Sequence, residues 1–179
     1  YKEVSATGKH VEIIRIQELG GVSNAIQKGT DIARNMAIEI SGLQREETDI
    51  SEVVMSIKCG ASDTTSGIAS NCVIGYVADK LVDLGATVIF GETTEFIGGE
   101  HLLARRAVGG ENGPVGRKIY QIVNEMEGRA KAIGCDMRKG QPTPGNIAGG
   151  LSSIEEKSLG AIMKSGSRPI QGVLEYPQH

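Results

Sequence analysis

The chain has 179 residues with a formal net charge of −3 and only 3% aromatic residues, so it lacks the basic surface and the stacking rings that nucleic acids require, and nucleic acid is excluded as the main partner. It contains no apolar run of 18 residues, which excludes a membrane span. Its three cysteines are too scattered for a disulfide framework, so we expect a cytoplasmic protein.

Residues 1–50 are predicted to form a lead-in arm and a first helix. The segment VEIIRI at 11–16 is typical of a short strand or an extended arm. Beyond Gly20 and Gly21, apolar residues recur at spacings of three and four, which predicts an amphipathic helix that ends near Gly42. The positions that define this helix are Ala25, Ile26, Ile32, Ala33, Met36, Ala37 and Ile40.

Residues 51–179 are predicted to form a single α/β core that carries the polar loops. Continuous apolar runs at 53–57 and 86–90 are typical of strands covered on both faces, and a helical pattern over 68–85 connects them. Further helices are expected at 100–107, at 115–133 after Pro114, and from a capping box at Ser152 and Ser153 to about Lys164. Glycine and proline exclude regular structure from 134–150, and a last strand is expected at 168–176. This order favours a mostly parallel, Rossmann-like sheet with helices on both faces.

The loop at 58–67, after the first core strand, is rich in small and polar residues. In open α/β sheets, ligands bind outside the carboxyl ends of the strands, and the N-terminus of the following helix attracts anions. Ser62, Asp63 and Thr65 are therefore candidates to bind a substrate carboxylate, or to cap that helix. Glycine, at 25 residues, is about twice as frequent as the usual ~7%, which favours tight turns and close approach of the backbone to a ligand.

Two further polar loops follow. Glu92 and His101 come after the strand at 86–90, and a carboxylate with an imidazole suits a divalent metal or acid–base chemistry. The alternative is a surface carboxylate and a helix-terminal histidine. In the third loop, at 141–150, two prolines stiffen the backbone before Gly145 and Asn146, which favours either a binding loop or a plain connector between helices.

Several standard signatures are absent: a GxGxxG that opens a helix, GxxxxGK[ST], GxSxG and HExxH. Cys59 is a candidate nucleophile, because a helix N-terminus and Lys58 would lower its thiol pKa. It is equally a candidate metal ligand or a packed small residue.

Three stretches of the chain resemble one known family. KCGASDTTSGIASN, FGETTEFIGGEHLLARRAV and QPTPGNIAGGLSSIEEKSLGAIMKSG are similar, in this order, to the altronate and galactarate dehydratases, also called altronate hydrolases. Their wording is nearest to the sulfolactate sulfo-lyase branch of the same family. The resemblance covers about residues 53–166 and is weaker over 16–29.

The resemblance implies a lyase that removes water from a sugar acid such as altronate or galactarate, or sulfite from sulfolactate. It implies a divalent metal, expected to be Fe(II), which with a helix N-terminus would stabilise the negative charge that develops in the reaction. Glu95 and Lys157 are among the positions that match the family's motifs, without a role assigned to them. From these motifs and the loops above we expect three roles: catalysis by His101, Glu92 and Lys58; metal binding by Cys59, Glu92 and His101; and substrate binding by Ser62, Asp63, Ser66, Arg106 and Asn146.

Members of this family are longer and carry an upstream domain, so we expect Tyr1 and His179 to be cut ends and an N-terminal domain or subunit to be missing. The expected partners are a small hydroxy acid and further copies in a homo-oligomer, and this chain alone is not expected to hold a complete site. The alternative is a non-catalytic α/β module that completes a site only with a missing partner domain.

Overall fold

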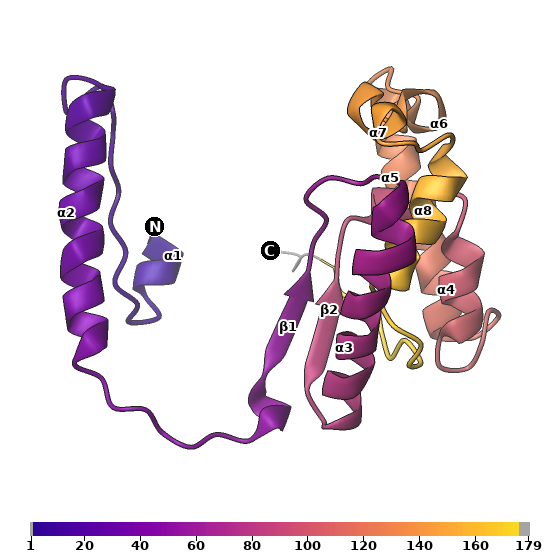
Figure 1. Ribbon diagram of the computed structural model, residues 1–179, viewed down its shortest axis with the longest axis horizontal. Helices are drawn as coiled ribbons and strands as arrows, with labels where there is room; N and C mark the ends of the chain where they lie inside the picture. The colour runs from indigo at the N-terminus through magenta and orange to yellow at the C-terminus, as the bar shows by residue number, and fades with distance from the viewer. Residues whose placement is uncertain (1, 176–179) are drawn as a thin grey trace. The chain divides into compact units, whose positions relative to one another are not determined.

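The computed structural model describes residues 2–175 and divides the chain into two compact units, residues 1–47 and 48–179. In the first unit, α1 (Lys2–Ser5) precedes an extended arm that runs alongside α2 (Val22–Ser41) (Figure 1). α2 is the predicted helix, and its C-cap is Gly42. The residues at 11–15 form no strand, so the arm alternative holds. Ala25 is the one buried residue of α2, so this unit has little core of its own.

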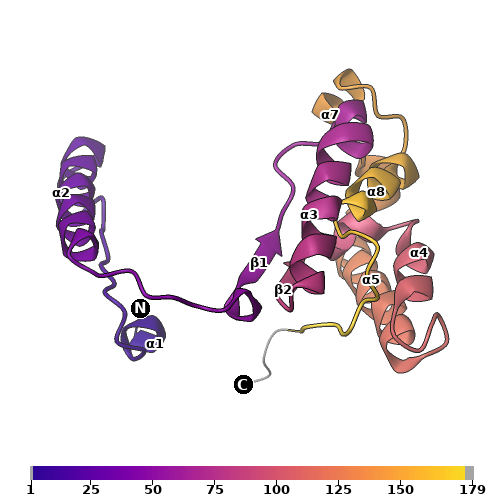
Figure 2. The same cartoon turned by 60° about the horizontal axis from the view of Figure 1, so that its bottom comes forward.

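The second unit contains a pair of parallel strands joined by a helical crossover. β1 (Val54–Ile57) pairs with β2 (Thr87–Phe90), with Ile57 opposite Phe90. The connection carries a π-helical turn, η2 (Ser66–Ser70), and α3 (Asn71–Asp83), which contacts β2. Both strands therefore end at the same edge, where the loops that follow them leave the sheet (Figures 1 and 2).

The predicted larger sheet is not found in residues 2–175, where the strands number two. The last predicted strand reduces to a single parallel bridge between Ala107 and Ile170, and its final residue, Tyr176, lies outside the described residues. Within residues 2–175 the two strands are not covered on both faces: Val54 is 61% exposed, and Ile57 is the one buried strand residue. A short apolar run indicates a strand but not what covers it.

Helices build most of the core. η1 (Ile50–Glu52) precedes β1, and after β2 come η3 (Thr93–Phe96), α4 (Glu100–Arg106), α5 (Pro114–Ala132), α6 (Met137–Gly140), α7 (Pro144–Ala148) and α8 (Ile154–Met163). The main hydrophobic cluster comes from η3, α4, α5, α8 and their flanks: Phe96, Ile97, Leu103, Ala107, Ile119, Val123, Ile154 and Ile162. The predicted helices at 100–107, 115–133 and 152–164 are thus confirmed. The expectation that 134–150 lacks regular structure is wrong, because Thr143 caps α7 and Pro144 fits its first turn.

Several glycines let α3 and α8 approach at backbone distance. A Cβ on Gly75 of α3 would come within 2.2 Å of the Met163 carbonyl oxygen, and one on Gly67 would come within 3.1 Å of Gly160 Cα. These glycines serve contact between helices, whereas the composition predicted tight turns and close approach of the backbone to a ligand. The consequence is a fixed position for the end of α8 against α3.

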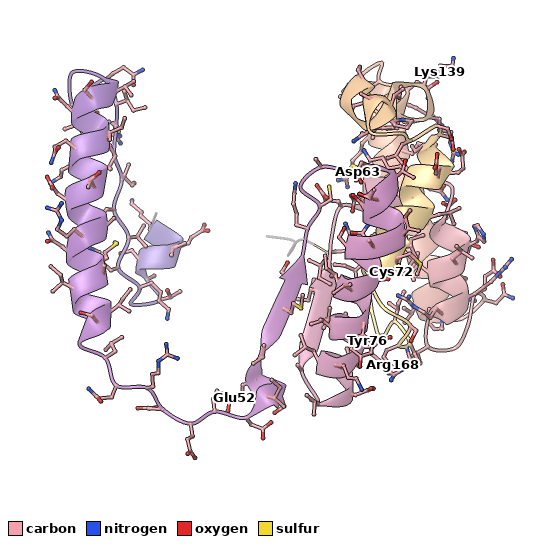
Figure 3. The ribbon with its side chains drawn as sticks, in the orientation of Figure 1. Glu52, Asp63, Cys72, Tyr76, Lys139 and Arg168 are labelled. Carbon is pink, nitrogen blue, oxygen red and sulfur yellow. The ribbon has the colours of Figure 1, made fainter. Side chains whose placement is uncertain are left out.

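The segment after α8 is tied to the C-terminal end of α3. The Ser167 and Arg168 backbone N–H groups donate to Asp79, and the Arg168 guanidinium forms two hydrogen bonds of 2.6 Å with Asp83. Figure 3 shows Arg168 near this end of α3 and Asp63 near the other. Among residues 2–175, no helix combines the length and apolar character needed to cross a membrane.

Candidate functional site

A thiol and two carboxylates meet where β1 and β2 end. The Cys59 Sγ atom and one carboxylate oxygen each from Glu92 and Glu95 all lie within 4.8 Å of one another. Glu92 Oε2 and Glu95 Oε1 are buried without a hydrogen-bond partner in the described part of the chain. Because buried polar atoms nearly always have partners, two such oxygens beside a thiol fit a bound cation. Mixed sulfur and oxygen donors suit a transition metal such as iron or zinc.

The electrostatics of this group keep its thiol protonated when no cation is bound. Burial and the neighbouring Glu95 and Glu92 raise the pKa of Cys59 to about 12. Burial also acts to raise the pKa of Glu92, but hydrogen bonds from Cys59 and Lys58 outweigh it and lower that pKa. The expectation that Lys58 lowers the Cys59 pKa is wrong, because its Nζ lies 3.3 Å from Glu92 Oε1. A protonated thiol is a poor nucleophile, so the thiol-enzyme alternative loses its basis.

The local backbone explains why both glutamates reach the group. η3 is a 3₁₀ helix with three residues per turn, so Glu92, its N-cap, and Glu95 lie on the same side. Glu92 adopts a left-handed φ of 62°, the single positive φ at a non-glycine position in the described chain. Such strain persists where the surrounding structure requires the conformation. Sequence analysis gave Glu95 no role, although the E-x-x-E spacing was a signal for it.

Of the expected metal ligands, the structure brings together Cys59 and Glu92, and the third member of the group is Glu95. His101 lies on α4 and is not a member of this group. Gly98, with a left-handed φ of 88°, and Gly99 separate η3 from α4, so sequence proximity to Glu95 does not carry His101 into the group.

Asp63 and Ser66 cap the start of the crossover helix. Asp63 Oδ1 accepts hydrogen bonds from Thr65 Oγ1 at 2.7 Å and from the Ser66 N–H and hydroxyl at 2.8 and 3.0 Å. These bonds, led by the one from Thr65, hold the pKa of Asp63 below its ordinary value. The sequence analysis considered substrate binding and helix capping for this loop. The described contacts of the Asp63 carboxylate are those of a helix cap.

Asn146 joins the first and third polar loops. Its Nδ2 donates to the Ser62 carbonyl at 2.8 Å, and its Oδ1 accepts from the Thr143 N–H and from Lys157 Nζ, each at 3.1 Å. Asn146 is 8% exposed and bonded at both ends of its amide, so it holds the loops together. The Thr64 N–H adds a bond of 3.0 Å to the Gly149 carbonyl. With the Lys58–Glu92 contact, all three polar loops lie together as the sequence predicted.

A shallow groove of about 360 Å³ runs beside this junction, between η2 and α8, and its lining includes Ser62, Asp63, Ser66 and Lys157. Lys157 Nζ bonds two amide oxygens, those of Gln141 at 2.8 Å and Asn146. Within residues 2–175, no carboxylate lies within ion-pair distance of Lys157. Its positive charge can therefore attract an anionic ligand, a role that the sequence analysis did not assign.

Arg106 connects α4 to the turn after α8. Its guanidinium donates to the Gly166 carbonyl and, at 2.7 Å, to Ser165 Oγ, and burial lowers its pKa. Lys58, by contrast, has a side chain that is 69% exposed. Both residues were expected to act in the site. In the structure Arg106 holds the turn at Ser165 and Gly166, whereas the Lys58 side chain is accessible to solvent.

These contacts define an α/β domain that presents a thiol, two carboxylates and a nearby lysine at the carboxyl end of parallel strands, where α/β proteins bind ligands. Residues 50–179 match the family model described as D-galactarate/altronate dehydratase, C-terminal. The chain belongs to this family.

Individual relatives are dehydratases and a sulfo-lyase. The chain is 43% identical to the (2R)-sulfolactate sulfo-lyase subunit beta of Chromohalobacter salexigens, over 96% of this chain and 44% of the relative. It is 39% identical to the galactarate dehydratase (L-threo-forming) of Escherichia coli, over 88% of this chain and 29% of the relative. It is 33% identical to the altronate dehydratase of Bacillus subtilis, over 91% and 32%. The chain thus spans less than half the length of these curated relatives.

Proposed function

We propose that this chain forms the C-terminal, metal-binding part of a lyase acting on a small 2-hydroxy acid. The reaction is loss of water from a sugar acid such as altronate or galactarate, or loss of sulfite from sulfolactate. Membership of a family of dehydratases and sulfo-lyases supports the reaction class. The observation that carries the proposal is the group of Cys59, Glu92 and Glu95 with its two unpartnered carboxylate oxygens.

In this proposal Cys59, Glu92 and Glu95 hold a divalent metal, with Fe(II) as the ion of choice. The metal, when bound, supplies a Lewis acid for the oxygen atoms of the substrate. Its thiol ligand must lose a proton, so metal binding releases one at neutral pH. Thiolate and carboxylate donors suit iron, zinc and cobalt alike.

The chain's own residues supply binding and proton transfer. Lys157, whose described partners are neutral amides, attracts the substrate carboxylate beside the N-terminal end of η2, and Ser62 lines the same groove. Lys58 and His101 are the proposed proton-transfer residues, because a lysine ammonium or a protonated histidine can donate a proton to a leaving hydroxyl. Glu92 is a metal ligand in this proposal; the alternative role from the sequence analysis is the base that removes the proton beside the carboxylate.

Exposed apolar residues support a further domain or subunit. Val54 of β1 is 61% exposed, and on α3 Val73 and Tyr76 are each 64% exposed. In the intact protein we propose that further strands extend β1 and β2 into a mostly parallel, Rossmann-like sheet covered on both faces. An N-terminal domain or a second copy in a homo-oligomer would bury these side chains. The three cysteines are free thiols, which supports a reducing, cytoplasmic setting.

Turnover of the intact protein tests the lyase proposal. Altronate, galactarate and sulfolactate are offered separately with Fe(II) under anaerobic conditions, with a chelated sample as control. We expect one of these acids to be consumed and the chelator to abolish that consumption. Absence of turnover with all three acids would contradict the proposal. Cys59→Ser should lower metal affinity and activity together; activity lost at unchanged metal affinity would restore the nucleophile alternative.

The exposed apolar surface also favours the second candidate, a module that completes a site only with a partner domain. Calorimetry of residues 1–179 alone, with Fe(II) and each acid, separates the two. Tight binding of metal and acid together by this chain alone would contradict the module. Binding that appears only with the intact protein would support it.

A further inference from the structure

We propose that Lys164 is a positioning residue for the metal site: it fixes the Glu95 carboxylate so that one oxygen is held toward Cys59 and Glu92. This inference rests on the proposed function, because it concerns how the donor group is held. Lys164 is no ligand itself and has no role in the sequence analysis. It acts through Glu95 alone.

The contact between the two side chains is buried on both sides. The Lys164 side chain is 3% exposed and that of Glu95 is 5% exposed, and Lys164 Nζ donates to Glu95 Oε2. Lys164 is the largest fully buried side chain in the described chain. A buried ammonium is costly without an anionic partner, and Glu95 is the partner that the described residues provide.

The second oxygen of Glu95 shows that this ion pair does more than satisfy a buried lysine. Oε2 is occupied by Lys164, while Oε1 is buried and has no hydrogen-bond partner in the described part of the chain. Glu95 belongs to the group of ligand atoms within 4.8 Å of one another. If this ion pair served stability alone, apolar side chains could replace it at little cost in free energy of unfolding. A buried Glu95 oxygen without a hydrogen bond would then only destabilise the protein.

The backbone that carries Lys164 is clamped from two sides. Gly75 of α3 lies against the Met163 carbonyl, so α3 closely adjoins the residue before Lys164. Arg106 of α4 donates to the Gly166 carbonyl and Ser165 Oγ, which holds the residues after Lys164. These contacts hold the backbone of Lys164 in place, so its ammonium approaches Glu95 from a fixed position. A positioning residue requires this, and a flexible surface lysine lacks it.

Charge and positioning predict opposite effects of removing Lys164. If its positive charge simply repels a bound cation, Lys164→Met should tighten metal binding. If Lys164 orients Glu95, the same substitution should weaken binding, because a Glu95 side chain without this partner is free to rotate away from Cys59 and Glu92. The sign of the change therefore separates the two.

The test titrates the intact protein with Co²⁺, using calorimetry and the sulfur-to-cobalt charge-transfer absorption that reports the Cys59 contact. We expect Lys164→Met to weaken Co²⁺ binding by about 10–100-fold and to alter the absorption band. The matched control is Lys131→Met, since Lys131 also pairs with a buried glutamate, Glu127, at 3.0 Å on α5. This control should change Co²⁺ affinity by less than about twofold, because Glu127, the partner of Lys131, does not belong to the group of Cys59, Glu92 and Glu95.

A double variant covers the case in which Lys164→Met does not fold. Glu95→Gln/Lys164→Met leaves a neutral pair, and it should bind Co²⁺ as weakly as Glu95→Gln alone, because Lys164 acts through Glu95. A double variant clearly weaker than Glu95→Gln, or a folded Lys164→Met with unchanged or tighter binding, overturns this inference alone. Absence of Co²⁺ binding in the unmodified protein overturns the metal site itself and the inference with it.

Discussion

Two glutamates, Glu95 and Glu127, are equally buried, at 6% exposure each, but their oxygens differ in what they contact. Glu127 Oε1 accepts from Arg138 Nε at 2.8 Å and pairs with Lys131, and its Oε2 accepts from Arg138 Nη2 at 3.2 Å. Glu95 uses Oε2 for Lys164, while its Oε1 has no partner in residues 2–175. Both oxygens of Glu127 have partners, so this carboxylate holds α5 and the residues of α6 together. Glu95 has one oxygen without a hydrogen-bond partner beside Cys59 and Glu92, and that oxygen is available to bind a cation.

The largest expected difference between these glutamates is in metal binding. Glu95→Gln should weaken Co²⁺ binding by about 100-fold, because a neutral amide is a poor ligand for the ion. Glu127→Gln should leave that affinity unchanged. Calorimetry on both variants, with circular dichroism to show that each is folded, measures the difference. Equal losses in the two variants would contradict the distinction.

Two glycines test the backbone around these ion pairs: Gly75, which lies against the residues that flank Lys164, and Gly128, next to Glu127. Gly75→Ala places a Cβ 2.2 Å from the Met163 carbonyl, beside Lys164, and should lower the free energy of unfolding by about 2 kcal/mol or more. A Cβ on Gly128, next to Glu127, meets nothing within 4 Å, so Gly128→Ala should raise it by about 0.5–1 kcal/mol. Urea unfolding of both variants measures the two signs. A neutral Gly75→Ala would show that α3 and α8 are not tightly packed there.

The ion pairs of Glu127 predict a dependence of stability on pH. Arg138 and Lys131 lower the pKa of Glu127 to about 2, below its value of about 4.3 in the unfolded chain. The stabilisation is therefore complete above about pH 5 and is lost as the pH falls toward 2, because the unfolded chain takes up the proton first. Arg138→Met should lower the free energy of unfolding by about 2 kcal/mol at pH 7. In urea unfolding, the loss of stability between about pH 5 and about pH 2, the acid limb, should also become smaller. An acid limb as steep as that of the unmodified protein would show that other carboxylates produce it.

The smallest expected effect is at Lys58. Its ion pair with Glu92, at 3.3 Å, involves a side chain that is 69% exposed, and exposed pairs contribute about 0–1 kcal/mol. Lys58→Met should therefore leave the free energy of unfolding nearly unchanged while lowering kcat if Lys58 transfers a proton. Thermal melting and turnover, measured on the same sample, separate the two effects. A large loss of stability would make Lys58 structural.

The sequence was sufficient to predict the strand pair and the edge at which the loops meet. The apolar runs at 53–57 and 86–90 each become a strand, and the loops that follow bring Cys59 and Glu92 together. The number of strands could not be predicted, because a four-residue apolar run is the same at an exposed edge and in a buried centre. Val54, 61% exposed, shows that hydrophobicity alone does not report what covers a strand.

The finer features of the site depend on contacts between distant residues. Asp63 and Asn146 have side chains that suit either a cap or a ligand contact, and tertiary hydrogen bonds decide which role the structure shows. The pKa of Cys59 could not be predicted from Lys58 next to it, since Glu92 and Glu95 reach the thiol from another loop. Lys164 could not be identified because nothing in its local sequence indicates a buried partner 69 residues away.

The two-stranded sheet has a practical consequence for work with this chain. β1 and β2 each keep one edge without a partner strand in the described residues, and β1 carries the exposed Val54. Open strand edges template pairing with other chains. Concentrated samples of residues 1–179 are therefore expected to associate edge to edge, and stoichiometries measured on them would include this association.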